Sequence, residues 1–327
     1  MKVLVFGAGV IGGQLAHALC LSGNDVTVVA RGAWAETLRR DGLRIRHYVQ
    51  KTETVDHPRV LEAPDDARYD AVFAVMQYRQ MEKILPALAA IDSPLVVLVG
   101  NNLSASEMEA RILAETKTPK TVLFGFQSTA GRREDGRVVA AHLGDGKLTV
   151  GGLHADAPLE AKVTVTKLFS GGRYTLSWCD NMDAWLKYHA AFIVPTVYLT
   201  YGVGCDLRKT TRAQRKQLLD AACEAYRLLM ALGVPVRPEG DEKSLEPGPR
   251  RRASSAVIWA MAKTKLGELC ASDHCRNAVG EMKDLSEGFD AIRARKPDFP
   301  MPAFDALRAA MPPWEELRRR YAKGSRR

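Results

Sequence analysis

A glycine-rich hexapeptide near the start of the chain most constrains its fold. The sequence Gly7-Ala8-Gly9-Val10-Ile11-Gly12 follows the apolar run 3–6 and opens a segment with helical periodicity at 10–22. In a G-x-G-x-x-G turn, the first glycine permits a tight bend, the second admits a pyrophosphate, and the third lets helix and strand pack closely. The helix N-terminus adds free amides and a positive dipole end. The motif predicts a dinucleotide site formed by Gly7, Gly9, Val10, Ile11 and Gly12, and the alternative is a purely structural turn.

Short β-branched runs alternate with helical patterns over the first part of the chain, which is typical of a parallel sheet with crossover helices. The expected strands are residues 3–6, 25–30, 70–75 and 95–99. The expected helices are residues 10–22, 33–40, 80–90 and 104–115. Further strands are expected at 122–126, 138–142 and 148–150, separated by turn-like segments at 133–136 and 144–146. These patterns predict a Rossmann-type, doubly wound α/β sheet that ends with antiparallel or mixed additions.

The second half of the sequence predicts a separate, all-α domain. The 327 residues are about twice the usual length of one domain. After Ser170-Gly171-Gly172 the expected elements are long helices at 182–201, 211–232, 254–270 and 278–294. We therefore expect a nucleotide-binding domain at 1–177 and a helical substrate or dimerisation domain at 178–327. Residues 246–249, Glu-Pro-Gly-Pro, and the three arginines after them predict a loop inside the helical half.

Residues 188–205 contain no Asp, Glu, Lys or Arg, so a membrane span has to be considered. Pro195, Gly202 and Gly204 interrupt this run, and it lacks flanking apolar length. A buried helix is the expectation, with no membrane partner.

The formal net charge of +9 comes mainly from the end of the chain. Residues 318–327 hold six basic residues and no acid, which leaves about +3 for the rest. Without a recognised nucleic-acid module, we expect a solvated terminus and no nucleic-acid partner, and salt-dependent binding through this tail is the alternative. The N-terminal sequence shows no signal-peptide pattern, so a cytoplasmic protein is expected. Cys270, His274 and Cys275 resemble half of a metal site, but no second pair stands at ligand spacing, so free thiols and no metal are expected.

Arg31 follows the second expected strand, where an NAD-selective fold usually carries an acidic residue that binds the ribose hydroxyls. A guanidinium at this position can bind a 2′-phosphate. The sequence therefore predicts NADP as cofactor. Arg39 and Arg40 could reinforce this site or face water, and Arg31 itself could be an ordinary surface residue.

Polar residues follow the next two strands. Gln77 comes after the strand at 70–75, and Asn101 comes after the strand at 95–99. The carboxyl edge of a parallel sheet is where ligands bind, so both are candidate cofactor-binding residues. The Asn101 amide could hold a nicotinamide ribose or a substrate oxygen. It could also be a turn residue, because Asn-Asn favours turns.

Lys187 is the one basic residue of the helix expected at 182–201, and it precedes the uncharged run. Its helical neighbours Ala190, Ala191 and Val194 are small or apolar. Such an ammonium either lies at an interface or is held for chemistry. A partly desolvated lysine has a lowered pKa and suits a general acid that acts on a carbonyl oxygen.

Together these residues resemble the ketopantoate reductase family. The resemblance rests on the glycine motif, on Asn101, on Trp185-x-Lys187 and on the segments 26–32, 41–45 and 135–151. It implies a Rossmann domain and a helical domain with NADPH and substrate between them. It also implies that Lys187 is the general acid and that Asn101 orients substrate or nicotinamide. Glu281 stands where the family has an acidic substrate-binding residue.

Two departures from the family fall on substrate contacts. Gln77 replaces a lysine, and residues 188–195 lack the asparagines that usually follow the catalytic lysine. An NADPH-dependent reductase of a 2-oxoacid or related carbonyl compound is therefore implied, with pantoate synthesis for pantothenate as one case and a homodimer through the helix near 217–232 as an option. Arginines at 250–252 or Arg276 could clamp a carboxylate. The alternative function is an NADPH-binding sensor or scaffold without turnover.

Overall fold

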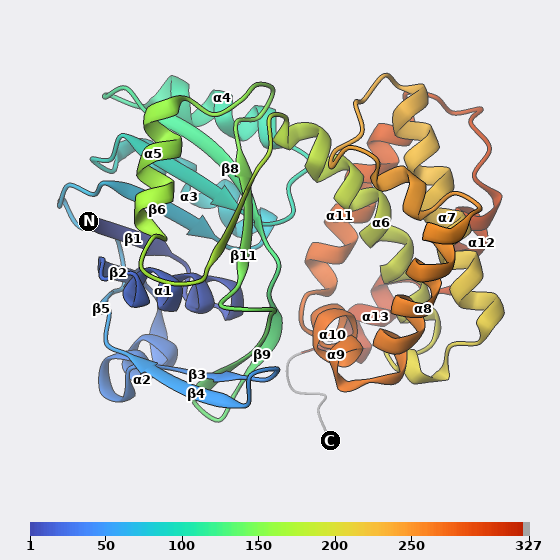
Figure 1. Cartoon of the computed structure of the whole chain (residues 1–327), viewed down its shortest axis with the longest axis horizontal. Helices are drawn as coiled ribbons and strands as arrows, with labels where there is room; N and C mark the ends of the chain where they lie inside the picture. Colours follow the sequence, from blue (N-terminus) through green and yellow to red (C-terminus); the bar gives the residue numbers. More distant parts are fainter. Residues whose placement is uncertain (323–327) are drawn as a thin grey trace. The chain divides into compact units, whose positions relative to one another are not determined.

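The computed structural model describes residues 1–322, so the last five residues of the basic tail lie outside the described part. The chain divides into two compact units, Met1–Met182 and Asp183–Arg327 (Figure 1). The first unit extends beyond residue 177 because strand β12 (Thr175–Trp178) still pairs with β11 (Lys147–Gly151). The amide of Met182 also donates a hydrogen bond of 3.0 Å to the carbonyl of Gly152.

Every residue of the first unit is described, and its main sheet has eight strands in the order β12-β11-β8-β7-β6-β1-β2-β5. The strands not yet given are β1 Lys2–Phe6, β2 Asp25–Val29, β5 Arg59–Leu61, β6 Ala71–Val75, β7 Leu95–Val99 and β8 Thr121–Gln127. Strands β5, β2, β1, β6, β7 and β8 pair in parallel, whereas β11 pairs antiparallel with β8. The expected doubly wound sheet with a mixed edge is confirmed.

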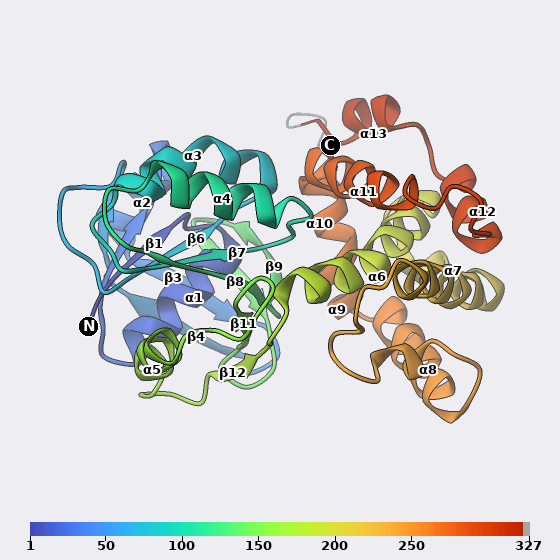
Figure 2. The same ribbon diagram turned by 90° about the horizontal axis from the view of Figure 1, so that it is seen from above.

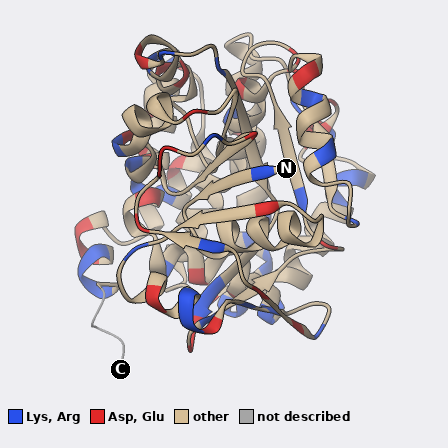
Figure 3. Cartoon of the chain, turned by 90° about the vertical axis from the view of Figure 1, so that its left-hand side faces the viewer, with Lys and Arg blue, Asp and Glu red and all other residues tan. Residues whose placement is uncertain are grey.

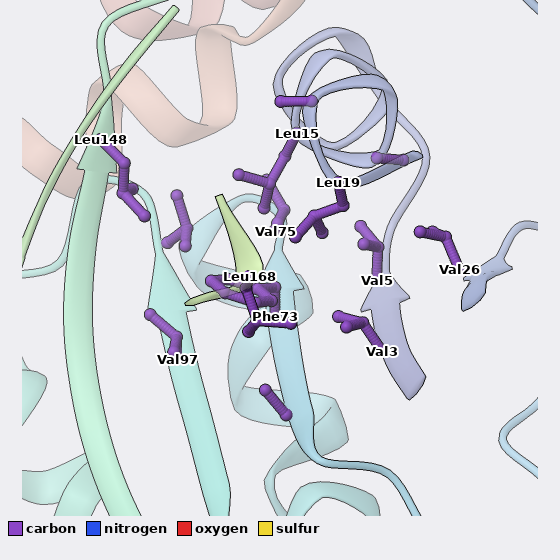
Figure 4. Close-up of a cluster of buried hydrophobic side chains, with 14 of the residues drawn as sticks. Val3, Val5, Leu15, Leu19, Val26, Phe73, Val75, Val97, Leu148 and Leu168 are labelled. Carbon is purple, nitrogen blue, oxygen red and sulfur yellow. The ribbon is translucent and has the colours of Figure 1, made fainter. Parts of the chain in front are cut away.

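Helices cover both faces of this sheet (Figure 2). They are α1 Val10–Leu21, α2 Gly32–Asp41, α3 Tyr78–Ala90, α4 Ala105–Glu115 and α5 Leu159–Leu168. Strands β6 and β7 are buried at every position, as continuous apolar strands between two helical layers must be. On one face, Leu15 and Leu19 of α1 and Leu168 of α5 pack with Phe73 and Val97 (Figure 4). The helices expected before residue 116 are confirmed within two residues at each end.

A second, smaller sheet of the first unit has four strands in the order β4-β3-β10-β9. Its strands are β3 Leu43–His47, β4 Thr52–Asp56, β9 Ala130–Glu134 and β10 Arg137–Ala141. The sequence analysis missed β3, β4 and β9, although β3 alternates buried and exposed residues as a strand with one covered face does. The expected turn at 133–136 was partly wrong, because β9 continues to Glu134 and only Asp135 and Gly136 turn, with positive φ angles of 47° and 71°.

Three histidines connect the small sheet to α1. His17 of α1 has its Nδ1 2.7 Å from a carboxylate oxygen of Asp56 on β4. The His17 ring centroid lies 5.1 Å from that of His47 on β3. His47 Nδ1 in turn lies 2.9 Å from Nε2 of His142, which follows β10. A continuous row of contacting side chains thus connects α1 to the small sheet.

The partners of these rings fix where the protons are. His142 Nδ1 lies 3.0 Å from the carbonyl oxygen of Gly144, so this nitrogen carries the proton and donates. With both rings neutral, His142 Nε2 accepts from His47 Nδ1, and His47 Nε2 accepts from the Thr54 hydroxyl at 2.8 Å. This arrangement requires both rings to be neutral, because a protonated imidazole cannot accept a hydrogen bond.

The surroundings favour the neutral rings. Burial lowers the pKa of His47 to about 4, and His17 and His142 act in the same direction, while Asp56 and Asp145 oppose them. Burial also lowers the pKa of His142. The contact between α1 and the small sheet is therefore complete at neutral pH and is weakened by acid.

We expect His47 to make the stability of the chain depend on pH. Because its pKa is about 4 when folded and about 6.5 when unfolded, acid protonates the unfolded chain first. Because of this difference in pKa, the free energy of unfolding should fall by about 2 kcal/mol when the pH is lowered from 7 to 5. His47→Asn, which can still donate to His142, should lose less stability over the same range. Urea unfolding at the two pH values measures this.

The matched control is His57→Asn, which makes the same substitution at an exposed histidine. This variant should show the pH dependence of the unsubstituted chain. An unchanged pH dependence in His47→Asn would contradict the role given to the histidine contact.

The described part of the second unit consists of helices and contains no strand. Its longer helices are α6 Met182–Gly202, α7 Arg212–Ala231, α8 Pro249–Lys263, α11 Val279–Arg293, α12 Pro302–Ala310 and α13 Trp314–Arg320. Three tyrosines of α6 find hydrogen-bond partners inside the unit. Tyr188 donates to the carbonyl of Val234 at 2.9 Å, Tyr201 donates to that of Cys275 at 2.8 Å, and Tyr198 pairs with Ser286 at 2.7 Å.

The uncharged run at 188–205 therefore belongs to a buried helix, as expected, since most of its residues in α6 are buried. Among residues 1–322, none of the helices combines the length and the apolar content that crossing a membrane requires.

The prediction of a loop over residues 246–249 and the following arginines was wrong in part. Helix α8 begins at Pro249, so the arginines at 250–252 are helical. Proline is tolerated at a first helical position because its missing N–H has no partner there anyway. The single helix expected at 254–270 was also wrong, because Thr264 adopts an extended conformation and ends α8. The chain resumes with short turns, α9 Lys265–Gly267, a π-turn Glu268–Ser272 and α10 Asp273–Asn277.

Candidate functional site

The glycine turn between β1 and α1 is built on two contacts that exclude side chains. Gly7 has a φ of +110°, and a Cβ on it would lie 2.3 Å from the carbonyl oxygen of Val75. A Cβ on Gly12 would lie 1.8 Å from the carbonyl oxygen of Gly7. These two glycines let β1, α1 and the end of β6 pack together.

Gly9 differs from its two companions. A Cβ on Gly9 would meet nothing within 4 Å, and its φ of −74° is open to any residue. Packing therefore does not explain this glycine. Gly9 is the N-cap of α1, and the amides of Val10 and Ile11 belong to the first turn, which has no intrahelical acceptors for its N–H groups. The open space above this helix end suits an anion that approaches the backbone.

The ends of β6 and β7 lie beside the glycine turn. Gly7 faces the carbonyl of Val75, and a Cβ on Gly100 would lie 3.2 Å from the carbonyl oxygen of Met76. Gln77 is the N-cap of α3, and its carbonyl accepts hydrogen bonds from the first turn of that helix. The Gln77 side chain is half-buried and makes no capping hydrogen bond.

Asn101 and Asn102 have different surroundings. The Asn102 side chain accepts a hydrogen bond of 3.0 Å from the Ser104 amide and lies 3.3 Å from the sulfur of Met108, so Asn102 organises the turn into α4. The side-chain oxygen of Asn101 is buried in a small pocket that Met76 also lines. Asn101 thus stands at the carboxyl edge of the sheet, next to the loop that carries Gln77.

Arg31 is exposed at the N-cap of α2, and it forms no ion pair with any residue between 1 and 322. Arg39 and Arg40 are engaged elsewhere: Arg39 pairs with Glu62 at 3.1 Å, and Arg40 pairs with the adjacent Asp41. Lysines and arginines alternate with acidic residues on the side drawn in Figure 3. Arg31 is therefore a free cation at the end of β2.

Trp34 is a component of this region that the sequence analysis missed. Its indole Nε1 donates a hydrogen bond of 2.7 Å to the carbonyl oxygen of Ala8, inside the glycine turn. The side chain is half-buried against the core. A tryptophan close after the second strand was the available signal, but the sequence does not show which backbone group it reaches.

Lys187 of α6 forms an ion pair inside the second unit. Its Nζ lies 2.5 Å from a carboxylate oxygen of Asp183, and the two side chains are 18% and 20% exposed. The neighbours Ala190, Ala191 and Val194 are buried. The sequence analysis missed Asp183, although it stands four residues before Lys187, on the same helical face.

Glu281 lies in the first turn of α11 and is buried. Its carboxylate is 3.3 Å from Nε2 of His274. Burial lowers the pKa of His274, but the charge and hydrogen bond of Glu281 outweigh that effect, so the pKa is raised above its ordinary value. The pair is therefore an imidazolium and a carboxylate over a wider pH range than a free histidine would allow.

Two of the four arginines considered for a carboxylate clamp are bound within the unit. Arg251 binds Asp220 and donates to the carbonyl of Leu245. Arg276 pairs with Asp273 at 3.2 Å and donates to a backbone carbonyl. The expected clamp at these two residues has no support in the structure.

The thiols of this region are not arranged as a metal site. Among residues 1–322, no group of three or more His, Cys, Asp or Glu side chains has a metal-binding geometry. Burial raises the pKa of the Cys270 thiol to about 11 and that of Cys275 well above its usual value.

The fold and the glycine turn define a class: a Rossmann-type unit followed by a helical unit. Residues 3–154 match the family model "Ketopantoate reductase PanE/ApbA". With the fold, this match confirms the resemblance found in the sequence: over slightly less than half of its length the chain is similar to the ketopantoate reductase family.

A curated relative, 2-dehydropantoate 2-reductase of Archaeoglobus fulgidus, is 28% identical over 172 residues, which cover 52% of this chain and 54% of that protein. The first curated relatives are matched over 14% to 54% of their own lengths. The 2-dehydropantoate 2-reductase structure from Methylococcus capsulatus has a TM-score of 0.73 at 18% identity, covering 99% of both chains.

D-mandelate dehydrogenase in its ternary complex with NADH and anilino(oxo)acetate has a TM-score of 0.72 at 16% identity, covering 99% of this chain and all of that one. At these identities the likeness shows a common fold.

We expect the three glycines of the turn to respond differently to substitution. Gly12→Ala should lower the free energy of unfolding by about 3 kcal/mol or more, because its Cβ would overlap the Gly7 carbonyl oxygen. Gly9→Ala should change it by about 1 kcal/mol or less, since its Cβ enters open space. Urea unfolding of both variants without nucleotide measures this. Equal losses would contradict the geometry given for the turn.

Proposed function

We propose that this chain is an NADPH-dependent reductase of a 2-oxoacid or a related carbonyl compound. The observation that carries the proposal is the glycine turn with open space above Gly9, followed at the end of β2 by the unpaired cation Arg31. The turn suits a pyrophosphate, and the cation suits a 2′-phosphate. The match of residues 3–154 to the ketopantoate reductase family supports the redox chemistry.

The choice of NADPH depends on local charge. An acidic residue that could bind free ribose hydroxyls is absent at position 31, where a guanidinium stands instead. D-mandelate dehydrogenase shares the fold and was solved with NADH, so the fold alone does not select the cofactor. We propose that Arg31 does so here, and that the Gln77 and Asn101 amides contact the nicotinamide ribose or the substrate.

NADPH, when bound, supplies the hydride to the carbonyl carbon. Lys187 is the proposed general acid, which passes a proton from its Nζ to the carbonyl oxygen as charge develops there. Asp183 holds this ammonium at 2.5 Å and so fixes its direction on α6. Glu281, kept in place by His274, is the proposed contact for a polar group of the substrate.

The substrate class follows from the family, and ketopantoate is the first compound to test. Its product would serve pantothenate synthesis in the cytoplasm, and a homodimer is compatible with this function. Gln77 stands where a lysine was expected, and residues 188–195 lack the expected asparagines, which favours a 2-oxoacid with a different side chain as the second compound to test. The competing proposal is a sensor that binds NADPH without oxidising it.

We expect Lys187→Met to lower kcat with the best 2-oxoacid at least 100-fold, because the proton donor is removed. NADPH affinity should change less than threefold, since Lys187 has no proposed contact with the cofactor. Asp183→Asn should lower kcat less, because the ammonium remains but loses its fixed position. Steady-state kinetics and a fluorescence titration with NADPH measure these effects.

Lys216→Met is the matched control, since Lys216 forms a helical ion pair with Asp220 at 2.8 Å but is 73% exposed. It should keep full kcat. Full turnover by Lys187→Met would refute the mechanism. Tight NADPH binding with no oxidation across a panel of 2-oxoacids would favour the sensor.

A further inference from the structure

Trp34 joins the two parts of the proposed nucleotide site. It lies in the first turn of α2, three residues after Arg31, and its indole N–H is bound to the Ala8 carbonyl of the glycine turn at 2.7 Å. The pyrophosphate turn and the turn that carries Arg31 are therefore held at a fixed separation by one rigid side chain.

Arg133 covers this tryptophan from a distant part of the sequence. Its guanidinium carbon lies 5.0 Å from the centroid of the Trp34 ring, a cation–π contact. Arg133 belongs to β9 of the small sheet. A second observation brings the same hairpin to α2: a Cβ on Gly136 would lie 3.6 Å from the methyl group of Thr37.

The charge of Arg133 is not used inside the protein. The guanidinium is exposed and forms no ion pair with any residue in the described range 1–322. Its neighbours in the small sheet are engaged, because Arg132 pairs with Glu134 at 2.6 Å and Arg137 pairs with Glu53 at 3.0 Å. Two arginines of the small sheet are thus neutralised, whereas Arg133 over Trp34 has no acidic partner among residues 1–322.

We propose that Arg133 is a second ligand of the 2′-phosphate and a determinant of the preference for NADPH over NADH. This inference rests on the proposed function. Arg31 at the start of α2 and Arg133 on β9 belong to two elements that meet at Trp34, and each guanidinium can bind a phosphate through paired N–H groups. Stacking on the indole orders the Arg133 side chain before the ligand arrives, which reduces the entropy lost on binding.

The role is specific for a phosphate on the ribose, so a pair of small nucleotides tests it without catalysis. The probes are 2′,5′-ADP and 5′-AMP, measured by calorimetry with the full chain. Arg133→Met should weaken 2′,5′-ADP binding at least tenfold and change 5′-AMP binding less than twofold. The affinity of Arg133→Lys for 2′,5′-ADP should lie between those of the wild type and Arg133→Met, because a lysine keeps the charge without the planar guanidinium. Arg137→Met, in the same sheet, should bind both probes like the wild type.

The outcomes distinguish failure of the proposed NADP site from failure of the role proposed for Arg133. If the wild type binds both probes equally, the proposed NADP site fails with the inference. If the wild type prefers 2′,5′-ADP and Arg31→Met abolishes the preference while Arg133→Met keeps it, only the role of Arg133 is refuted. If Arg133→Met weakens both probes alike, Arg133 supports Trp34 or the adenine, and the inference is again refuted. Urea unfolding of Arg133→Met checks that the small sheet is intact.

Discussion

The contact between Gly12 and the Gly7 carbonyl is the constraint on which the first unit depends. Without side chains at these two positions, α1 can begin directly against β1 and the end of β6. The buried face of α1 then covers Phe73 and Val97 at the centre of the sheet. The N-cap of the same helix, Gly9, has open space where a side chain would stand. One turn thus contributes to the core and carries the anion site that we propose.

The periodic parts of this fold could be predicted from the sequence. Strands β6 and β7 are continuous apolar runs, and α1, α6 and α7 have clear helical patterns with glycine or polar residues at their ends. The small sheet could not be predicted so easily, because β4 and β9 are largely polar. Its position depends on long-range contacts, the histidine chain to α1 above all, which local periodicity does not contain. The end of α8 at Thr264 could likewise not be predicted from the helical periodicity of the sequence.

The same distinction applies to the candidate site. Residues whose role follows from the backbone, such as Gly7, Gly12 and Arg31, stand out in the sequence because a motif fixes their place. The roles of Trp34, Arg133 and Asp183 do not stand out in the sequence, because each depends on a contact made in the fold. Trp34 binds a carbonyl of the glycine turn, Arg133 stacks on the Trp34 indole, and Asp183 pairs with the Lys187 ammonium. Asn101 and Asn102 show the limit of local chemistry, since only the fold shows that Asn102 organises the turn into α4 while the side-chain oxygen of Asn101 lies in a small pocket.

A calorimetric titration of the full chain with NADPH and with NADH shows whether the first unit selects NADPH, as we propose. A cation without an acidic partner at the end of β2 predicts that NADPH binds at least tenfold more tightly than NADH, with an advantage that shrinks as salt is added. Equal affinities, or tighter binding of NADH, would contradict the account of Arg31. Failure to bind either nucleotide would contradict the account of the glycine turn itself.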